Sequence, residues 1–198
     1  KQPTGPDGHW LEPLTFLSVI AGATESVRLG TNILLAALRR PAVLAKSLAT
    51  LDVLSNGRVD LGVGVGWQKE EYDACGLDFA NRGRLLDHTL EVCQTLWTQP
   101  SAQYSANELQ FSGIHAMPKP LQNGGVPIWV SGTVNKLSMR RLATFGYGWI
   151  PWGPDAIDIT SGIESMRKAV SAYGRDPDEI QVIGTLPITR NDDGIDLN

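Results

Sequence analysis

The sequence predicts an α/β protein built on a parallel sheet, and we expect that sheet to belong to a (β/α)8 barrel. Strand-like and helical segments alternate along the 198 residues, which is typical of right-handed crossover units. The apolar fraction of 42% is sufficient for one sizeable core. A glycine-rich strand near residue 60 favours a barrel interior over the centre of an open sheet.

Hydrophobic periodicity assigns the elements in order. The first part of the chain reads as helix 13–26, strand 27–35, a helix opened by Pro41 and stopped at Asn56-Gly57, strand 59–65 and helix 82–97. The second part reads as strand 126–130, helix 133–145, strand 148–152, helix 159–173 and strand 180–188. These are five strands, whereas a barrel of this type has eight, so three strands are missing from the chain.

A polar connection, residues 99–125, separates the third helix from the next strand. Connections of this length without secondary structure are uncommon unless they have a function. We therefore predict that it is an insertion acting as a lid that excludes water from the barrel mouth. Residues 1–198 as a whole are expected to form a single, partial barrel domain.

The glycine-rich strand is the most informative segment. Period two places Val59, Leu61, Val63 and Val65 on one face and Arg58, Asp60, Gly62, Gly64 and Gly66 on the other. The bare carboxyl end of the second face allows a flat ring or a phosphate to approach the backbone closely. Relief of crowding between packed elements explains the same glycines equally well. The segment is not a dinucleotide fingerprint, because Trp67 or Lys69 occupies the place of the third glycine.

Two further segments combine glycine with small polar residues. Gly30-Thr31-Asn32-Ile33 interrupts an apolar strand, which predicts either an irregular backbone where a ligand meets the sheet or a short polar interior layer. Val130-Ser131-Gly132-Thr133 precedes a helix, where backbone N–H groups attract an anion or a hydroxyl caps the helix. Both segments are candidate binding sites.

The familiar catalytic sets do not occur. His9, His88 and His115 are isolated from one another, so the sequence predicts neither a metal site nor a nucleophile dyad. Cys75 and Cys93 lack metal-ligand spacing and are too few for a disulfide scaffold. A reducing compartment, the cytoplasm, is therefore expected.

Charged clusters offer weaker candidates. Glu70, Glu71 and Asp73 follow Trp67 and include a possible acid or base, although such a cluster more often solvates a first helical turn. Arg39 and Arg40 precede a helix that begins with proline. They are candidates for phosphate binding, but solvated surface arginines are the preferred interpretation.

Charge and hydropathy exclude several classes of partner. The net charge is −4 and no like-charged run exceeds two residues, which argues against nucleic acid and against an anionic membrane surface. The longest mainly apolar stretch, residues 14–23, is about half of what a membrane-spanning helix needs. The polar first ten residues are not a secretory signal. The absence of an initial Met suggests that the true beginning was removed.

A series of motifs, in this order, strongly resembles the bacterial luciferase-like monooxygenase family: 24–31, Arg39-Arg40-Pro41, 48–58, 61–67, 79–86, 127–130 and 145–149. The resemblance runs from about residue 10 to 188. It is closest to the branch that uses the deazaflavin coenzyme F-420, and the FMN branch shares much of the pattern. It implies an eight-stranded barrel that holds a tricyclic ring at the carboxyl ends of its strands.

The resemblance also implies a cofactor site. The ring's back face would rest on the irregular segment 31–33, where related enzymes often have a non-proline cis peptide, and 64–67 would line the pocket beside it. Segment 131–133 would meet the ribityl chain or phosphate. The cofactor-binding residues so predicted are Gly30, Thr31, Asn32, Ile33, Gly64, Gly66, Trp67, Ser131, Gly132 and Thr133.

The chain departs from the family pattern in three ways. Trp67 stands where some relatives carry a catalytic Glu, which argues against sugar-phosphate dehydrogenase chemistry of that type. Gly146-Tyr147-Gly148-Trp149 replaces Gly-Asp-Gly-Trp, a change expected to be structural. The strands present correspond to the third to the seventh of the family. The acidic or His residue at the end of the second strand is therefore absent, and no catalytic residue is assigned within the chain.

These observations together predict a flavin- or deazaflavin-dependent oxidoreductase or monooxygenase that transfers a hydride or an oxygen atom to a small organic substrate. Coenzyme F-420 is the expected cofactor and FMN the alternative, and the protein is expected to be a homodimer. The competing hypothesis is a non-catalytic flavin-binding protein or a truncated structural member of the same family.

Overall fold

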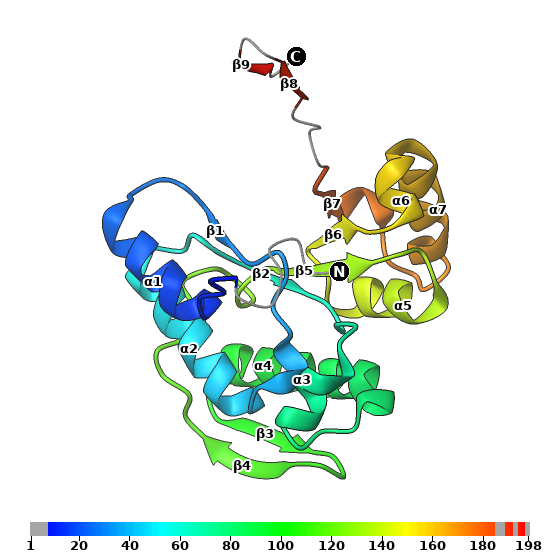
Figure 1. Cartoon of the computed structure of the whole chain (residues 1–198). Coiled ribbons are helices and arrows are strands. Elements are labelled where there is room, and N and C mark those ends of the chain that lie inside the picture. The colour runs from blue at the N-terminus through cyan, green and yellow to red at the C-terminus, as the bar shows by residue number, and fades with distance from the viewer. Residues whose placement is uncertain (1–7, 185–188, 192–193, 197–198) are drawn as a thin grey trace. The chain divides into compact units, whose positions relative to one another are not determined.

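A parallel β-sheet organises the chain, as described by a computed structural model for residues 8–184, 189–191 and 194–196. Its strands hydrogen bond in the order β1-β2-β5-β6-β7 (Figure 1). The strand bounds are β1 (Leu29–Gly30), β2 (Val59–Val63), β5 (Ile128–Gly132), β6 (Gly148–Pro151) and β7 (Gln181–Val182). The α/β class with a parallel sheet that the sequence predicts is confirmed.

Contacts within the chain divide it into two compact units, Lys1–Trp129 and Val130–Asn198, and each is described by itself. Strand β5 contributes residues to both units. The helices of the first unit are α1 (Pro13–Ala23), α2 (Pro41–Leu54), α3 (Lys69–Ala74) and α4 (Arg82–Thr98), with 3-10 turns η1 (Ala36–Leu38) and η2 (Phe79–Asn81). Those of the second are α5 (Lys136–Phe145), α6 (Pro154–Ile157), α7 (Ile159–Ser171) and the 3-10 turn η3 (Pro177–Glu179).

Helices α1, α2 and α4 form a layer in the first unit, with α2 between the other two (Figure 1). Proline at the first helical position starts both α1 and α2, where its missing N–H costs nothing. The leucine stripe of α2, with Leu44 and Leu48, and that of α4, with Leu86 and Leu90, are at most 1% exposed. The helical periodicity of the sequence therefore locates the core of this unit.

Strand β2 confirms only part of the face assignment. Val59, Leu61 and Val63 are fully buried, as expected. Asp60 on the other face accepts hydrogen bonds from Arg28 and from the indole of Trp129. These partners agree with a polar layer at the start of that face.

The Arg58 side chain does not continue that polar layer. Its buried guanidinium donates to the carbonyls of Ala21 (3.0 Å) and Thr24 (2.8 Å) at the end of α1, and to that of Val27 (2.8 Å). The prediction for this side chain was wrong because carbonyls left over at the end of a helix need donors, and Arg58 supplies them.

The connection from 99 to 125 contains an antiparallel hairpin, β3 (Ala102–Ser105) and β4 (Gln110–Ile114), that the sequence does not predict. Strand β3 packs on α4 (Figure 1). The Tyr104 hydroxyl lies 2.9 Å from Nδ1 of His88 and donates to Glu91 (2.8 Å). The two strands are short and carry few apolar side chains in alternation, Ala102 and Tyr104 in β3 and Phe111 in β4, which is too little to predict a strand.

The second half of this connection is fixed near the amino-terminal end of β2. Asp52 of α2, fully buried, accepts hydrogen bonds from the backbone N–H groups of Leu121 (2.8 Å) and Gln122 (3.2 Å). Lys119 donates to two carbonyls at the end of α4. The predicted site lies beyond the other end of β2, and the lid role of this connection stays a prediction.

The second unit has its own core. Met139 and Leu142 of α5 and Met166 and Val170 of α7 are at most 1% exposed, and so is Trp149 of β6. The expected strands and helices are present, with α5 starting at Lys136 instead of Thr133. The final strand expected over 180–188 is β7, and residues 185–188 lie outside the described residues.

Among the described residues, no helix combines the length and the apolar character that crossing a membrane requires. The same residues contain no group of three His, Cys, Asp or Glu side chains arranged to hold a metal ion.

Candidate functional site

After β1 the regular hydrogen-bond pairing with β2 is interrupted at Thr31 and resumes three residues later, at Leu34. The Thr31 N–H donates to the carbonyl of Asp60 (3.3 Å), and the buried Thr31 hydroxyl donates to that of Gly62 (2.8 Å). Pairing with β2 resumes at Leu34, whose N–H also reaches the Gly62 carbonyl (2.8 Å). Between these two points the Asn32–Ile33 peptide bond is cis, as it often is in enzymes of the resembled family. The irregular backbone expected here is present.

The carboxyl end of β2 lies beside this segment. The Gly64 N–H donates to the Leu34 carbonyl (3.4 Å), and Gly66 has a φ of 70°. A Cβ on Gly66 would lie 3.0 Å from Cδ2 of Leu35. Glycine is therefore required at this position both by its backbone conformation and by close packing against the segment that follows β1.

Trp67 follows this turn and is 65% exposed. An exposed indole of this size next to a strand that carries no side chain at Gly64 offers a flat apolar surface. No charged residue occurs in 31–35 or 63–67. The uncharged character of both segments fits a planar ring, and we call 30–35 together with 63–67 the ring seat.

The first unit therefore brings together seven of the ten predicted cofactor residues on two adjacent segments. They are Gly30, Thr31, Asn32, Ile33, Gly64, Gly66 and Trp67. Asn32 is exposed and Ile33 is half-buried, whereas Gly64 is buried. Their contact with a cofactor stays a prediction.

The other three, Ser131, Gly132 and Thr133, lie at the end of β5 in the second unit and are half-buried. The carbonyl of Gly132 accepts the indole N–H of Trp149 (2.9 Å). The side chain of Asn135, not a Ser or Thr of this segment, caps α5 by accepting from the backbone of Leu137 and Ser138. The expected hydroxyl cap was wrong because the helix starts three residues later.

An acidic group also lies near this segment. The Val134 N–H donates to Oδ2 of Asp155 (2.7 Å), so a backbone donor next to the predicted phosphate contact is already satisfied by a carboxylate. Gly153 packs there as well, with its Cβ position 3.5 Å from Cγ2 of Thr133. Phosphate binding by this segment stays a prediction.

The isolated histidines have ordinary surroundings. His88 bonds Tyr104 in the hairpin contact, and burial lowers its pKa. His9 and His115 are both exposed. The Tyr104 hydroxyl is held in its neutral form, since burial and then the neighbouring Glu91 carboxylate raise its pKa to about 12. This cluster therefore fastens the hairpin to α4.

The charged candidates are engaged in surface contacts. Arg39 pairs with Glu12 at the start of α1 (2.5 Å). Glu70 and Glu71 occupy the first turn of α3, where a carboxylate is favourable, and Asp73 pairs with Lys69 (2.5 Å). These contacts agree with the structural interpretations of both clusters.

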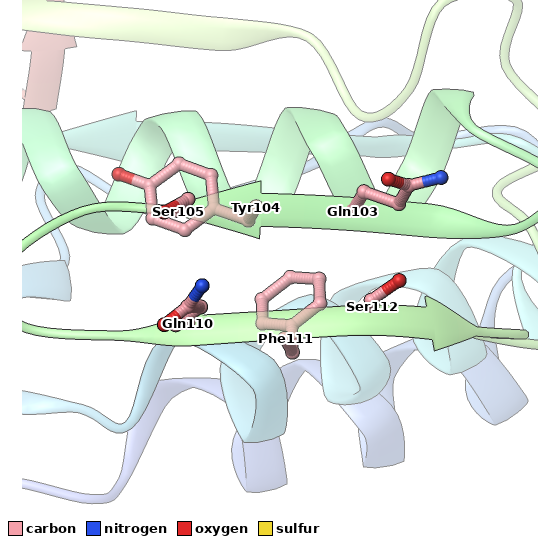
Figure 2. A pocket seen from close by; sticks show the side chains of 6 residues that line it. All are labelled: Gln103, Tyr104, Ser105, Gln110, Phe111 and Ser112. Atoms are coloured by element: carbon pink, nitrogen blue, oxygen red, sulfur yellow. The ribbon is translucent and has the colours of Figure 1, made fainter.

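A shallow pocket lies on the hairpin and is formed by residues that do not belong to the ring seat (Figure 2). It is lined by Gln103, Tyr104, Ser105, Gln110, Phe111 and Ser112. The rings of Tyr104 and Phe111 stack across the two strands with centroids 5.9 Å apart. Its lining is uncharged and carries no group suited to acid–base chemistry at neutral pH.

Sequence reasoning missed Tyr72 of α3. Its ring is fully buried, and its hydroxyl donates to the carbonyl of Val65 (2.7 Å), between Gly64 and Gly66 of the ring seat. The available signal was an aromatic residue within a short acidic helix directly after the glycine-rich strand. Periodicity cannot identify it, because a helix of six residues is too short to show a stripe.

The chain belongs to the luciferase-like monooxygenase family, whose model matches residues 4–194. It is 35% identical over 174 residues to an uncharacterized protein of Mycobacterium tuberculosis (strain ATCC 25618 / H37Rv). The aligned region covers 86% of this chain and 61% of that protein. The chain therefore spans about three fifths of the length of this curated relative.

Solved structures share the fold. A riboflavin lyase, RcaE, solved with modified FMN and riboflavin, matches with a TM-score of 0.78 and 18% identity, covering 92% of this chain and 46% of that chain. An F420-dependent secondary alcohol dehydrogenase in complex with an F420-acetone adduct matches with a TM-score of 0.75 and 19% identity, covering 90% and 55%. The chain thus has the fold of the luciferase-like family and spans about half the length of these two solved chains.

Proposed function

We propose that the protein binds a flavin-type ring on the ring seat and works as an oxidoreductase on a small organic substrate. The observation that carries this proposal is the juxtaposition of the irregular segment 31–33 with the side-chain-free, uncharged end of β2. Membership of the luciferase-like family supports it.

The residues of the ring seat would hold the ring from two sides. The Thr31–Ile33 backbone would support one face, kept in place by the Thr31 hydroxyl on the Gly62 carbonyl. Gly64 and Gly66 would allow close approach, and the exposed Trp67 would exclude water at the edge. When bound, a reduced deazaflavin supplies a hydride, and reduced FMN with oxygen supplies an oxygen atom.

Coenzyme F-420 is the proposed cofactor and FMN the alternative. Structural relatives were solved with a cofactor of each kind, which supports a flavin-type ring without favouring either one. The ribityl chain or phosphate is proposed to meet Ser131, Gly132 and Thr133.

The experiment is a titration of the purified full-length gene product with coenzyme F-420 and, separately, with FMN, followed by the visible spectrum. Micromolar binding of one of them, with turnover in the presence of a reductant and candidate substrates, is the expected result. Absence of binding to both would overturn the proposal.

A non-catalytic cofactor-binding protein is the second candidate. One observation favours it: no charged residue that could serve as an acid or base occurs in the ring seat. Binding without turnover under every combination of reductant and substrate would support this candidate against the enzyme.

We also propose that the protein is a homodimer. Helix α1 has no charged residue, and the only exposed charge of α2 is Lys46. Their solvent side exposes Phe16, Val19, Val43 and Leu54 by 47% to 71%. We call these four residues the α1–α2 face.

A further inference from the structure

Tyr72 connects the end of the ring seat to α4. Its phenol hydroxyl donates to the Val65 carbonyl at 2.7 Å, and its ring is 0% exposed. Val65 lies two residues beyond Val63, where β2 ends, so the parallel ladder no longer fixes its carbonyl. This half-buried carbonyl outside the ladder still requires a hydrogen-bond donor, and the Tyr72 hydroxyl supplies it.

The Tyr72 ring is itself held on its other side. Phe79 contacts it edge to face, with centroids 5.5 Å apart and planes at 78°. The guanidinium of Arg82, the first residue of α4, covers the Phe79 ring at 4.1 Å. The Leu77 N–H donates to the Tyr72 carbonyl (2.9 Å), which closes the turn between α3 and η2. A continuous series of contacts therefore runs from the first residue of α4 to Val65.

The Gly64–Trp67 segment is thus held at three successive points. Gly64 is bonded to Leu34, and Gly66 packs on Leu35, both from the segment after β1. Val65 is held by the hydroxyl of Tyr72 in α3. Trp67 is 65% exposed and depends on these backbone contacts for its position.

We propose that Tyr72 is a positioning residue for the ring seat. Its hydroxyl fixes the Val65 carbonyl, and thereby the backbone positions of Gly64 and Gly66 and the orientation of the Trp67 side chain. The inference rests on the proposed function, since the ring seat is its object. Tyr72 does not touch the cofactor in this arrangement and acts through Val65.

The test is Tyr72→Phe in the full-length protein, which removes the hydroxyl and keeps the ring against Phe79. The dissociation constants for coenzyme F-420 and for FMN are measured by the change in cofactor fluorescence. We expect the constant of the bound cofactor to rise about tenfold, because the released carbonyl no longer fixes the glycines. A second readout, acrylamide quenching of Trp67 emission in the cofactor-free protein, is expected to increase. The same measurement on Trp67→Phe, with and without Tyr72→Phe, gives the emission of the other five of the six tryptophans, which is subtracted to obtain that of Trp67.

Tyr104→Phe is the matched control, because it also removes a hydrogen-bonded hydroxyl, from the hairpin and not from the ring seat. It is expected to change neither readout by more than about twofold. An unchanged dissociation constant in Tyr72→Phe, with the wild-type protein binding normally, would overturn the role of Tyr72 alone. A wild-type protein that binds neither cofactor would overturn the proposed function and this role together. Equal loss of affinity in both variants would show a general effect of stability and would likewise overturn it.

Discussion

Glu12 is the residue whose environment predicts a pH dependence. Burial opposes its ionisation, but hydrogen bonds from Thr15, Arg39 and Leu14 outweigh this and lower the pKa from 4.5 to about 2. A pKa lowered by folding contributes stability that is present above the unfolded value of about 4.5 and is lost as the pH falls toward 2. Glu12 is also the N-cap of α1, and Arg39 joins it to the turn after the ring seat.

We therefore predict that Glu12→Gln lowers the free energy of unfolding by about 1 kcal/mol at pH 6, and by less at pH 3. The effect is small because the Glu12 side chain is 43% exposed, so solvent screens its interactions. Urea unfolding at the two pH values measures the difference. The control is Glu164→Gln on the exposed side of α7, which should show no such difference. A Glu12→Gln deficit that is equal at both pH values would contradict the assignment.

Asp52 is the second residue that the structure singles out. Its Oδ2 accepts the backbone N–H groups of Leu121 and Gln122, and its Oδ1 accepts the Gln122 side chain (2.8 Å) and the Val59 N–H (3.4 Å). The carboxylate is fully buried, and each of these groups is a donor. In asparagine one of the two carboxylate oxygens is replaced by an NH2 group, which is itself a donor and would face one set of these donors.

We predict that Asp52→Asn destabilises the protein by about 1 to 3 kcal/mol, measured by urea unfolding at pH 7. Asp73→Asn makes the same chemical change on the exposed surface of α3 and is expected to cost about 0.5 kcal/mol or less. Equal effects of the two substitutions would mean that the bonds to the connection contribute nothing beyond a surface ion pair.

At the scale of elements, the sequence predicts those segments whose pattern and burial coincide. The five strands of the sheet and the helices α1, α2, α4, α5 and α7 follow from apolar periodicity, because each buries one stripe or face. The hairpin β3–β4 and the short helix α3 lack such a pattern. Tyr104 of the hairpin and Tyr72 of α3 form hydrogen bonds to partners outside their own elements, which a local sequence pattern does not reveal.

The candidate site was predictable to the extent that it depends on backbone. Gly64 and Gly66 are recognisable because glycines alternate with valines in the sequence of this strand. The 31–33 segment is recognisable because polar residues interrupt an apolar strand. The role of the Tyr72 hydroxyl was not predictable, because the sequence does not show whether a tyrosine hydroxyl donates to a backbone carbonyl or to solvent. The start of α5 lies three positions beyond the predicted Thr133, because apolar periodicity locates the body of a helix better than its ends.

The glycine positions of the ring seat are not equivalent as tests. At Gly66 any side chain is strained by the φ of 70° and meets Leu35, so a substitution there lowers stability whether or not a cofactor binds. Gly64 does not have a positive φ. We predict that Gly64→Val abolishes cofactor binding while the protein stays folded, and that Gly66→Val loses both.

The measurements are fluorescence titration with coenzyme F-420 and with FMN, and thermal unfolding of the same samples. Gly22→Val is the control, since a Cβ there meets nothing within 4 Å. Gly64→Val with wild-type affinity would assign the glycines to packing and remove the principal support for the ring seat.

At the scale of the whole molecule, the proposed dimer places the α1–α2 face at the subunit contact. An apolar helix without a polar side is normally buried. Helix α2 already has α1 on one flank and α4 on the other, so its outer side is not available to another helix of the same layer. A second copy is the occupant we favour, because α1 and α2 expose no carboxylate and a single cation, Lys46, so two chains of net charge −4 would meet there without like negative charges facing each other.

We predict that the wild-type protein has the mass of a dimer in sedimentation equilibrium, and that Val19→Asp combined with Val43→Glu shifts it to monomers. The double substitution places carboxylates at the contact on both copies, where Lys46 is the only cation of the two helices, and the resulting repulsion and desolvation cost more than the lost apolar contact. Ile157→Asp is the matched control, because Ile157 is 89% exposed and belongs to the second unit. A monomeric wild-type protein, or a double variant that remains dimeric, would exclude the α1–α2 face as the subunit contact. Because the ring seat of the first unit involves neither Val19 nor Val43, the double variant should retain the cofactor affinity of the wild-type protein.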